Sequence, residues 1–475
     1  MKSADRGFPQ EFDWGLYPQA ENFLIQHIDT FLKSNSFAYK LSSRMERETS
    51  TRFFDWIDHI VLPESVVREK DIKEAGFQEV PDVEAPADMR VFMQSRTVFF
   101  PILLTKKRFI EVVLKPEILE HFIQVIGKNL PIEGDIYAPY RKATISAQDN
   151  YVLSAVERRG YQGFRIHEKT SDTWEYRRAI EAFFCRERHF ENFREGMDAT
   201  QQLVEDMCRK LSPARVTDAF FRAERMYWER RNRAGQLQKS RQDRLGLGWG
   251  NHDHHTYRSS RENFMRLIKI FETLGFMRRE QFFAGEEAGW GAQILEHPQC
   301  NIVVFADIDL LKEEKDEDFT RYELRQITHM GTVGLWVGLH GESIFQAGLH
   351  HLAARFDFEK FRTDLKQQGI NTMNPFSYFE FLKQSFTEGE TWSVSKKRLN
   401  DILVRGSVTK AQYETFLGSG AVGSHLENLQ RTQGFKGFNQ HSVSAIIKAT
   451  DPRKYKELII KTAYEILIDN KMDML

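Results

Sequence analysis

The chain has 475 residues, a length that predicts two or three domains. Its 67 basic and 68 acidic residues nearly cancel, which argues against nucleic acid or an anionic membrane as the partner. Its three scattered cysteines argue against a disulfide framework and a cysteine-based zinc site, and they favour a reducing compartment.

The sequence has no stretch of about 18 apolar residues, so we expect no membrane-spanning helix. Residues 1–7 are polar and lack the apolar segment of a signal peptide. We therefore expect a cytoplasmic protein. The composition leaves open whether the protein forms a homo-oligomer.

The first part of the chain, residues 1–170, has patterns of both helix and strand. Apolar residues at helical spacing predict a helix over 18–34. An apolar run at 53–62 predicts a buried strand, and a polar helix is expected over 64–75. Alternating residues over 89–104 predict two further strands. We interpret this part as an N-terminal α+β region.

Residues 171–245 are heavily charged and predict a helical connector. Aromatic residues recur at roughly helical intervals, Pro213 interrupts the pattern, and a second helix is expected over 216–244. Between positions 221 and 244, eight basic residues face three acidic ones. A nucleic-acid interface could have this composition, but the neutral whole chain favours a solvated connector.

Residues 246–475 repeat one order of elements. A segment around His254 leads into a predicted helix over 260–274, and a later predicted strand over 344–356 leads into a helix over 359–368. Further strands are expected at 281–284, 291–296 and 301–307. This order is typical of paired βαβββ modules. We therefore predict an α+β fold in which these modules form a curled mixed sheet around a cleft.

Two histidines and a glutamate are the candidate metal ligands of this region. His254 and His351 lie in predicted strands, and Glu427 follows far along the chain. Two imidazoles and one carboxylate that leave coordination positions open are the usual ligands of a non-haem ferrous ion. A single histidine or glutamate in these contexts would more often be structural, so the prediction depends on the three side chains converging.

Each candidate histidine is followed four residues later by an arginine, Arg258 or Arg355, and these two are the candidate catalytic residues. Strand alternation places Arg258 on the face of His254, where a guanidinium can bind a substrate carboxylate. The same alternation places His252 on that face, provided that the strand is regular.

Several neighbouring residues are alternatives or supports. Only one of His350 and His351 can face a cleft; the spacing to Arg355 favours His351 and leaves His350 at the rim or in solvent. His425 and Gln430 could orient the ligands. The carboxylates that could replace Glu427 are Glu296, Glu342, Glu388 and Glu390.

Region 251–431 resembles the 2-oxoadipate dioxygenase/decarboxylase (hydroxyglutarate synthase) family, a branch of the vicinal-oxygen-chelate superfamily. The segments that carry the resemblance are Asp253-His254 to Arg258, His350-His351-Leu352-Ala353-Ala354-Arg355, Leu382-Lys383-Gln384-Ser385-Phe386, Gly423-Ser424-His425 and Glu427 to Arg431. Ala353-Ala354 replace a Thr-Pro of the family pattern, and His425 is closer to Glu427 than in that pattern.

The resemblance implies that His254, His351 and Glu427 bind Fe(II) and that Arg258 binds the substrate. It implies a dioxygenase that decarboxylates and hydroxylates a 2-oxo acid, as in the conversion of 2-oxoadipate to 2-hydroxyglutarate. His59 lies in a similar strand context without evident partners. We therefore interpret the N-terminal region as a degenerate module with a vestigial site.

Two other functions fit parts of the pattern. Three histidines within residues 252–255 are compatible with a metal-dependent hydrolase, although the aspartate is misplaced for a metallo-β-lactamase site. A protein that binds a small molecule without turnover could also have a chelate-type fold. Zinc content and indifference to oxygen would favour the hydrolase. Retention of metal after replacement of His254 or His351 would favour the non-catalytic binding protein.

Overall fold

The computed structural model describes residues 14–284, 288–314, 317–439 and 450–454. The polar segment 1–7, on which the expectation of no signal peptide rests, lies outside these residues. In the described part of the chain, each helix is too short or too polar to cross a membrane.

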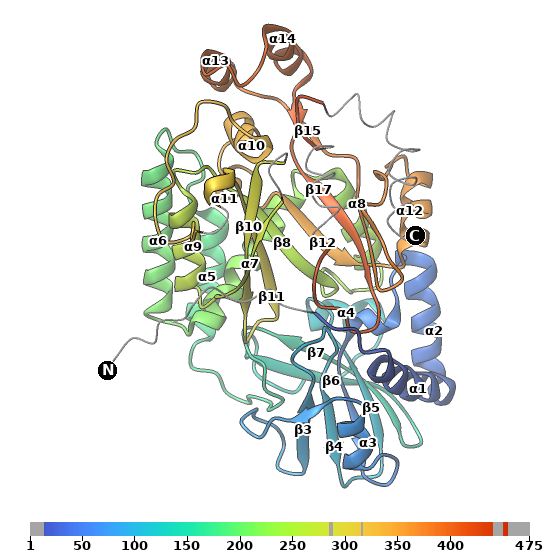
Figure 1. Ribbon diagram of the computed structural model, residues 1–475. Coiled ribbons are helices and arrows are strands. Elements are labelled where there is room, and N and C mark those ends of the chain that lie inside the picture. Colours follow the sequence, from blue (N-terminus) through green and yellow to red (C-terminus); the bar gives the residue numbers. More distant parts are fainter. Residues whose placement is uncertain (1–13, 285–287, 315–316, 440–449, 455–475) are drawn as a thin grey trace.

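Two mixed β-sheets, one above the other, form the centre of the molecule (Figure 1). The strands of the first sheet are β1 (Ile57–Pro63), β2 (Gln78–Glu79), β3 (Met89–Met93), β4 (Ile102–Thr105), β5 (Ile110–Leu114), β6 (Tyr140–Gln148) and β7 (Tyr151–Arg158). Their order is β2-β3-β4-β1-β5-β7-β6. The helices of this part are α1 (Pro18–Ser34), α2 (Ser36–Arg44), α3 (Glu69–Glu74) and α4 (Leu119–Val125).

The second sheet contains the strands of the C-terminal half. These are β8 (His252–Arg258), β9 (Met277–Phe283), β10 (Trp290–His297), β11 (Ile302–Asp309), β12 (His351–Arg355), β13 (Ser377–Tyr378), β14 (Leu382–Phe386) and β17 (His425–Arg431). Their order is β13-β14-β17-β12-β8-β11-β10-β9. The accompanying elements are α9 (Phe264–Thr273), α10 (Thr332–His340), α11 (Ser343–Gln346), α12 (Phe358–Gln367), α13 (Lys396–Val404), α14 (Lys410–Ser419) and the β15 (Thr391–Trp392) and β16 (Ala421–Val422) pair.

Both sheets follow one plan. At the centre of the first sheet, β1 runs antiparallel to β5. The parallel neighbour of β1 is β4, and that of β5 is β7. At the centre of the second, β8 runs antiparallel to β12, with β11 and β17 as the parallel neighbours. A helix follows each of these four central strands. The predicted α+β fold of paired βαβββ modules is therefore confirmed, and the N-terminal part follows the same plan with seven described strands instead of eight.

The structure corrects two of the predicted elements. Residues 344–356 are not one strand, because α11 precedes β12 and Gly348, with φ +80°, forms the turn between them. The helix expected over 216–244 is two helices, α7 (Pro213–Glu229) and α8 (Arg233–Asp243). Asn232 separates them, because its side chain accepts a hydrogen bond from Gly235 N and thereby caps α8.

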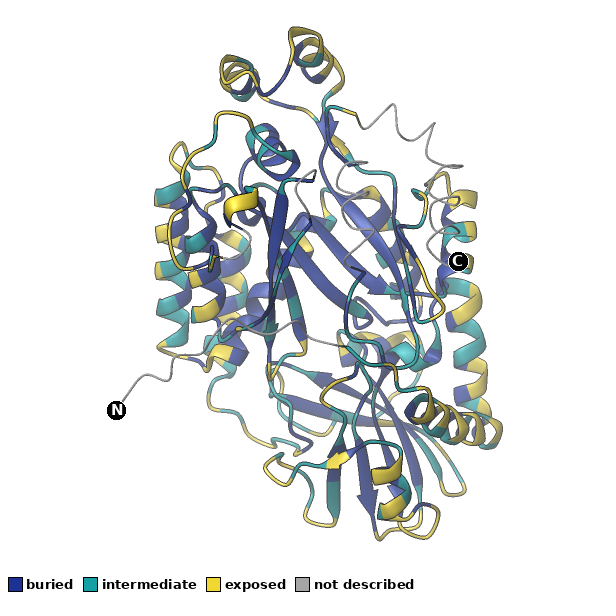
Figure 2. Ribbon diagram, in the orientation of Figure 1, coloured by how far each residue is buried: buried dark blue, intermediate teal, exposed yellow. Residues whose placement is uncertain are grey.

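The helical segment is not a solvated connector, contrary to the prediction. It also contains α5 (Thr173–Cys185) and α6 (Phe193–Cys208), and α7 is packed in the same core as β8 and α9. Phe220 and Phe221 of α7 are fully buried. Its charges are buried too, since Glu224 binds both Arg186 and Arg188. Among the basic residues counted in the sequence, Arg222 lies close to the buried Glu157, whereas Arg230, Arg233 and Arg244 are exposed. The strands that these helices cover are largely buried (Figure 2).

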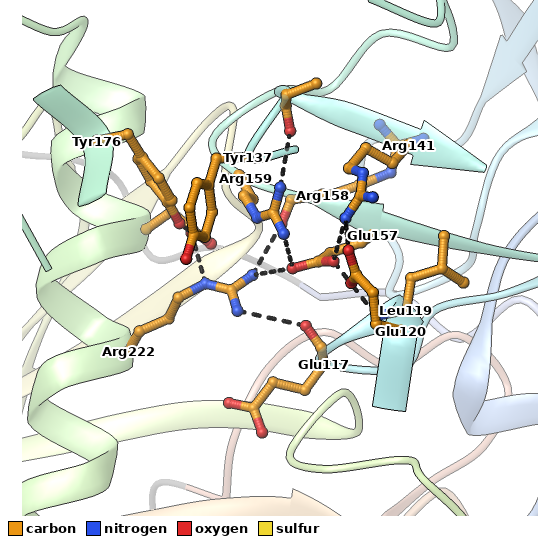
Figure 3. A network of polar contacts seen from close by, with 12 residues as sticks. Glu117, Leu119, Glu120, Tyr137, Arg141, Glu157, Arg158, Arg159, Tyr176 and Arg222 are labelled. Atoms are coloured by element: carbon orange, nitrogen blue, oxygen red, sulfur yellow. Dashed lines mark hydrogen bonds and ion pairs between the residues drawn. The ribbon is translucent and has the colours of Figure 1, made fainter. Parts of the chain in front are cut away.

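A second charged network joins α7 to the first sheet (Figure 3). Arg222 binds Asp218 on its own helix, and its guanidinium lies 3.4 Å from Glu157 at the end of β7. Arg159 binds the same Glu157 carboxylate at 2.7 Å. Because Glu157 is buried, these guanidinium groups supply the positive charge that it requires.

The glycine-rich approach to β8 passes close to the first sheet. A Cβ atom at Gly250 would lie 2.2 Å from the backbone oxygen of Lys115, which a side chain cannot tolerate without moving the backbone. We expect Gly250→Ala to lower the free energy of unfolding by about 1–3 kcal/mol, as overpacked sites do. Urea denaturation measures this change. Gly418→Ala, at an open position of α14, is the control and should not destabilise the protein.

Candidate metal centre

Three neighbouring strands bring the predicted ligands together. His254 comes from β8, His351 from β12 and Glu427 from β17, and their candidate ligand atoms all lie within 4.8 Å of one another. Glu427 Oε2 is 3.2 Å from His254 Nε2 and 3.0 Å from His351 Nε2. Among the described residues, this is the one such group of three.

The strand register explains how distant residues converge. Ala353 of β12 pairs with His254 on one side and with Glu427 on the other, so both ligands share its face of the sheet. His351 lies two residues before Ala353 and therefore points to the same face. The small side chain of Ala353 leaves space between the ligands.

A β-bulge places Asp253 behind His254. Ala353 pairs with His254 and Ala354 with His252, so Asp253 is the extra residue of β8. Its carboxylate Oδ1 is 3.0 Å from His254 Nδ1. An Nδ1–H that donates to this carboxylate leaves the Nε2 lone pair free for a metal ion.

The positions of His252 and Arg355 differ from those expected from regular strand alternation. His252 does not share the pocket of His254; it lines a cavity between the two sheets instead. Arg355 also lies outside the pocket, and its Nε donates to Asp253 at 2.8 Å. Arg431 binds the same carboxylate through two nitrogens, each at 3.1 Å. Arg355 therefore supports Asp253 in this structure, and its predicted catalytic role remains a prediction.

Two further polar residues contact the ligands. Gln384 of β14 donates from Nε2 to Glu427 Oε1 at 2.8 Å. Thr256 Oγ1 is 2.9 Å from His351 Nε2. Together with Asp253, these residues hold the imidazole and carboxylate groups in fixed orientations. No sequence pattern indicated this function for Thr256 or Gln384, although Gln384 lies in a motif that carried the resemblance.

The surroundings favour the metal-binding protonation states of two of the three ligands, Glu427 and His351. Burial would raise the pKa of Glu427, but His254 and His351 lower it well below its usual range. Burial lowers the pKa of His351, which favours its neutral form. Burial would also lower the pKa of His254, but Glu427 and Asp253 raise it to about 9. A cation that binds here must therefore displace a proton from His254.

The ligands face a small cavity of about 60 Å³ with aromatic walls. Its aromatic residues are Phe282, Trp290, Phe305, Phe376, Phe386 and Phe438. Arg258 and Asp307 also line it, as the predicted alternation along β8 requires for Arg258. Burial lowers the pKa of Arg258 to about 10 and raises that of Asp307 to about 7.

Arg258 is a buried cation that is not in an ion pair with any described carboxylate. Only 3% of it is exposed. Its Nε has no hydrogen-bond partner, and its guanidinium carbon lies 5.8 Å from the ring centroid of Trp336. The carboxyl groups of Asp307, Asp309 and Asp451 act on its charge from a distance, and a buried guanidinium that is not in an ion pair would be stabilised by an anion that enters the cavity.

The remaining predicted residues lie at other places. His350 is buried against Trp336, with ring centroids 5.0 Å apart, and does not lie at a rim. His425 Nδ1 is 3.0 Å from Thr387 O. Gln430 Oε1 accepts a hydrogen bond from Phe358 N and does not orient a ligand. None of the alternative carboxylates, Glu296, Glu342, Glu388 and Glu390, joins the group of three described ligands.

The first sheet contains a counterpart of this centre. Asp58 is the extra residue of the same bulge, and its carboxylate binds His59 Nδ1 at 2.7 Å and Arg158 through two nitrogens. These three residues correspond to Asp253, His254 and Arg431.

The other two ligand positions of the first sheet differ. The register places Glu111 where the second sheet has His351, and Ser154 where it has Glu427. Lys142 Nζ lies 2.7 Å from Glu111 Oε1, to which Ser154 Oγ also donates. A lysine ammonium thus provides the positive charge here. This arrangement supports the interpretation of His59 as part of a vestigial site.

Comparisons with known proteins give only distant structural likenesses. No family model and no curated protein matches the chain. A triple variant of 4-hydroxymandelate synthase from Streptomyces coelicolor is 11% identical, with a TM-score of 0.26, covering 85% of this chain and 98% of that one. Methylmalonyl-CoA epimerase from Mycobacterium tuberculosis is 12% identical, with a TM-score of 0.21, covering 38% and 89%. Likenesses at this level assign no activity.

Proposed function

We propose that this protein is an Fe(II)-dependent dioxygenase that decarboxylates and hydroxylates a 2-oxo acid. The observation that carries the proposal is the unpaired guanidinium of Arg258 in the same buried cavity as His254, His351 and Glu427. An anion-binding group beside a set of metal ligands fits a substrate that carries a carboxylate. The resemblance to the 2-oxoadipate dioxygenase/decarboxylase family suggested by the sequence is compatible with this substrate class.

The donor set fits ferrous iron. His254, His351 and Glu427 would hold the ion, and their two nitrogens and one carboxylate leave coordination positions open. None of the described residues that line the cavity is a cysteine, the ligand that softer metals prefer. Ferrous iron held there would activate dioxygen, which is the oxidant of the 2-oxo acid.

The protein's own residues have distinct functions in this proposal. Arg258 binds a substrate carboxylate and thereby orients the molecule in the cavity. The aromatic walls exclude water, which strengthens this charge interaction. Asp307, with a pKa of about 7, lies in the same cavity and can hold a proton at its carboxyl group near neutral pH.

Oxygen uptake tests the proposal. Protein purified without oxygen and loaded with ferrous iron is mixed with a panel of 2-oxo acids of different length. We expect oxygen consumption with release of one carbon dioxide for each oxygen molecule consumed. Ester or phosphodiester hydrolysis with zinc, without oxygen uptake for any 2-oxo acid, would instead establish a metal-dependent hydrolase.

Replacing Arg258 separates substrate binding from metal binding. Arg258→Met is expected to raise KM for the 2-oxo acid at least about tenfold, because a charge-assisted hydrogen bond is lost. The iron content should not change, because Arg258 is not one of the three ligands. Steady-state kinetics and metal analysis measure the two effects. The control is Arg266→Met, because Arg266 is a partly exposed arginine of α9 that does not line the cavity. Loss of iron in Arg258→Met would show that its assigned role is wrong.

A further inference from the structure

A large cavity lies between the two sheets, apart from the metal centre. One chamber has a volume of about 330 Å³, within the range of small-molecule sites, and a neighbouring chamber has about 170 Å³. Both are lined by residues of the first and the second sheet, including Asp58 and His252. The metal-centre ligands do not line either chamber, so a molecule bound here would not contact them.

The lining of the two chambers is rich in basic residues. Eight basic residues and six acidic residues contribute to it. Three of the six acids pair with arginines of the lining: Asp58 with Arg158, Asp218 with Arg222, and Asp253 with two arginines at once. Because the basic residues outnumber the acidic ones, the lining has an excess of positive charge.

Lys115 is the centre of this excess. It lines both chambers and forms no hydrogen bond or ion pair through its ammonium group with a described residue. Burial lowers its pKa; Asp58 partly offsets this effect, and three arginines add to it. These arginines, all lining the chambers, are Arg158, Arg225 and Arg355. A lysine among three guanidinium groups is stabilised when an anion binds between them.

The neighbouring arginines have binding capacity left. Arg225 is 5% exposed, its Nε has no partner, and its closest carboxylate oxygen, on Glu117, is 3.7 Å away. Arg355 uses Nε for Asp253, and no described residue accepts from its two terminal nitrogens. A group with several oxygen acceptors could bind these donors together with Lys115.

From these contacts we infer that the cavity between the sheets is a second binding site, specific for a small molecule that carries an oxyanion group, a phosphate or a carboxylate. Lys115 is its main charged contact, and Arg225 and Arg355 are the flanking contacts. Because Arg355 also binds Asp253, which orients His254, an anion at this site lies two side chains from a metal ligand.

Isothermal titration calorimetry on the full chain tests the site. The protein is treated with a chelator so that no metal contributes, and it is titrated with inorganic phosphate or with succinate. The succinate titration uses the Arg258→Met variant, so that the metal-centre cavity does not bind the probe. Because neither titration requires turnover, its result is independent of the proposed dioxygenase function.

We expect saturable binding of at least one probe, weakened tenfold or more by Lys115→Met. Lys107→Met is the matched control and should leave the affinity unchanged. Lys107 is an exposed lysine of the connection between β4 and β5, and it pairs with Asp88. The stronger probe identifies the oxyanion class. Absence of binding for both probes, or equal affinity in Lys115→Met, would overturn the inference.

A second measurement covers the case in which Lys115→Met does not fold. Crystals of the unmodified protein are soaked in selenate, and the selenium positions are determined from anomalous scattering. A selenium position in contact with Lys115 Nζ would support the site. Selenate bound only at the molecular surface would overturn it.

Discussion

Glu427→Ala is expected to reduce bound ferrous iron from a stoichiometric amount to background and to abolish oxygen uptake with any 2-oxo acid. Glu427 supplies the negative charge of the ligand set, and its Oε2 lies between the Nε2 atoms of His254 and His351. Without this carboxylate, two neutral imidazoles remain, and these hold ferrous iron weakly. Metal analysis after desalting and an oxygen electrode measure the two losses.

The matched control for this variant is Ser154→Ala, at the corresponding strand position of the first sheet. It removes a hydrogen bond to Glu111 and should leave iron content and oxygen uptake unchanged. Full iron occupancy in Glu427→Ala, with a native circular dichroism spectrum, would contradict the assignment of Glu427 as a ligand.

Asp253→Ala is expected to lower the free energy of unfolding by about 3–5 kcal/mol, because it leaves buried guanidinium charge uncompensated. Arg431 and Arg355 both bind this carboxylate, and Arg431 is 7% exposed. The same change removes the acceptor that orients His254, which should weaken iron binding about 10–100-fold. Urea denaturation and metal titration measure these effects.

The first sheet offers a control for this second variant. Asp58 binds His59 and Arg158 as Asp253 binds His254 and Arg431, so Asp58→Ala should also destabilise the protein. It should not weaken iron binding, because His59 is not among the proposed ligands. If both variants lost iron to the same extent, the loss in Asp253→Ala would be due to lower stability of the protein and not to the orientation of His254.

The three ligands could be predicted from the short sequence motifs around them and from the order of these motifs along the chain. The strand register that brings them together could not be predicted. Convergence depends on Ala353 pairing with His254 on one side and Glu427 on the other, and register between distant strands is set by tertiary packing. Gln384 reaches Glu427 through the same long-range pairing.

The errors have identifiable physical causes. Alternation along β8 predicted His252 on the face of His254, but the bulge at Asp253 reverses it. The charge of the helical segment suggested solvent exposure, yet Glu224 and its two arginine partners neutralise one another inside the protein. Charge composition alone does not distinguish an exposed helix from one whose charges are paired in the core.

The most direct measurement of the metal centre is X-ray diffraction near the iron absorption edge, from crystals grown without oxygen in the presence of ferrous iron. We predict an anomalous peak within coordination distance of His254 Nε2, His351 Nε2 and Glu427 Oε2. An anomalous peak elsewhere, with none between these three side chains, would contradict the assignment of this centre.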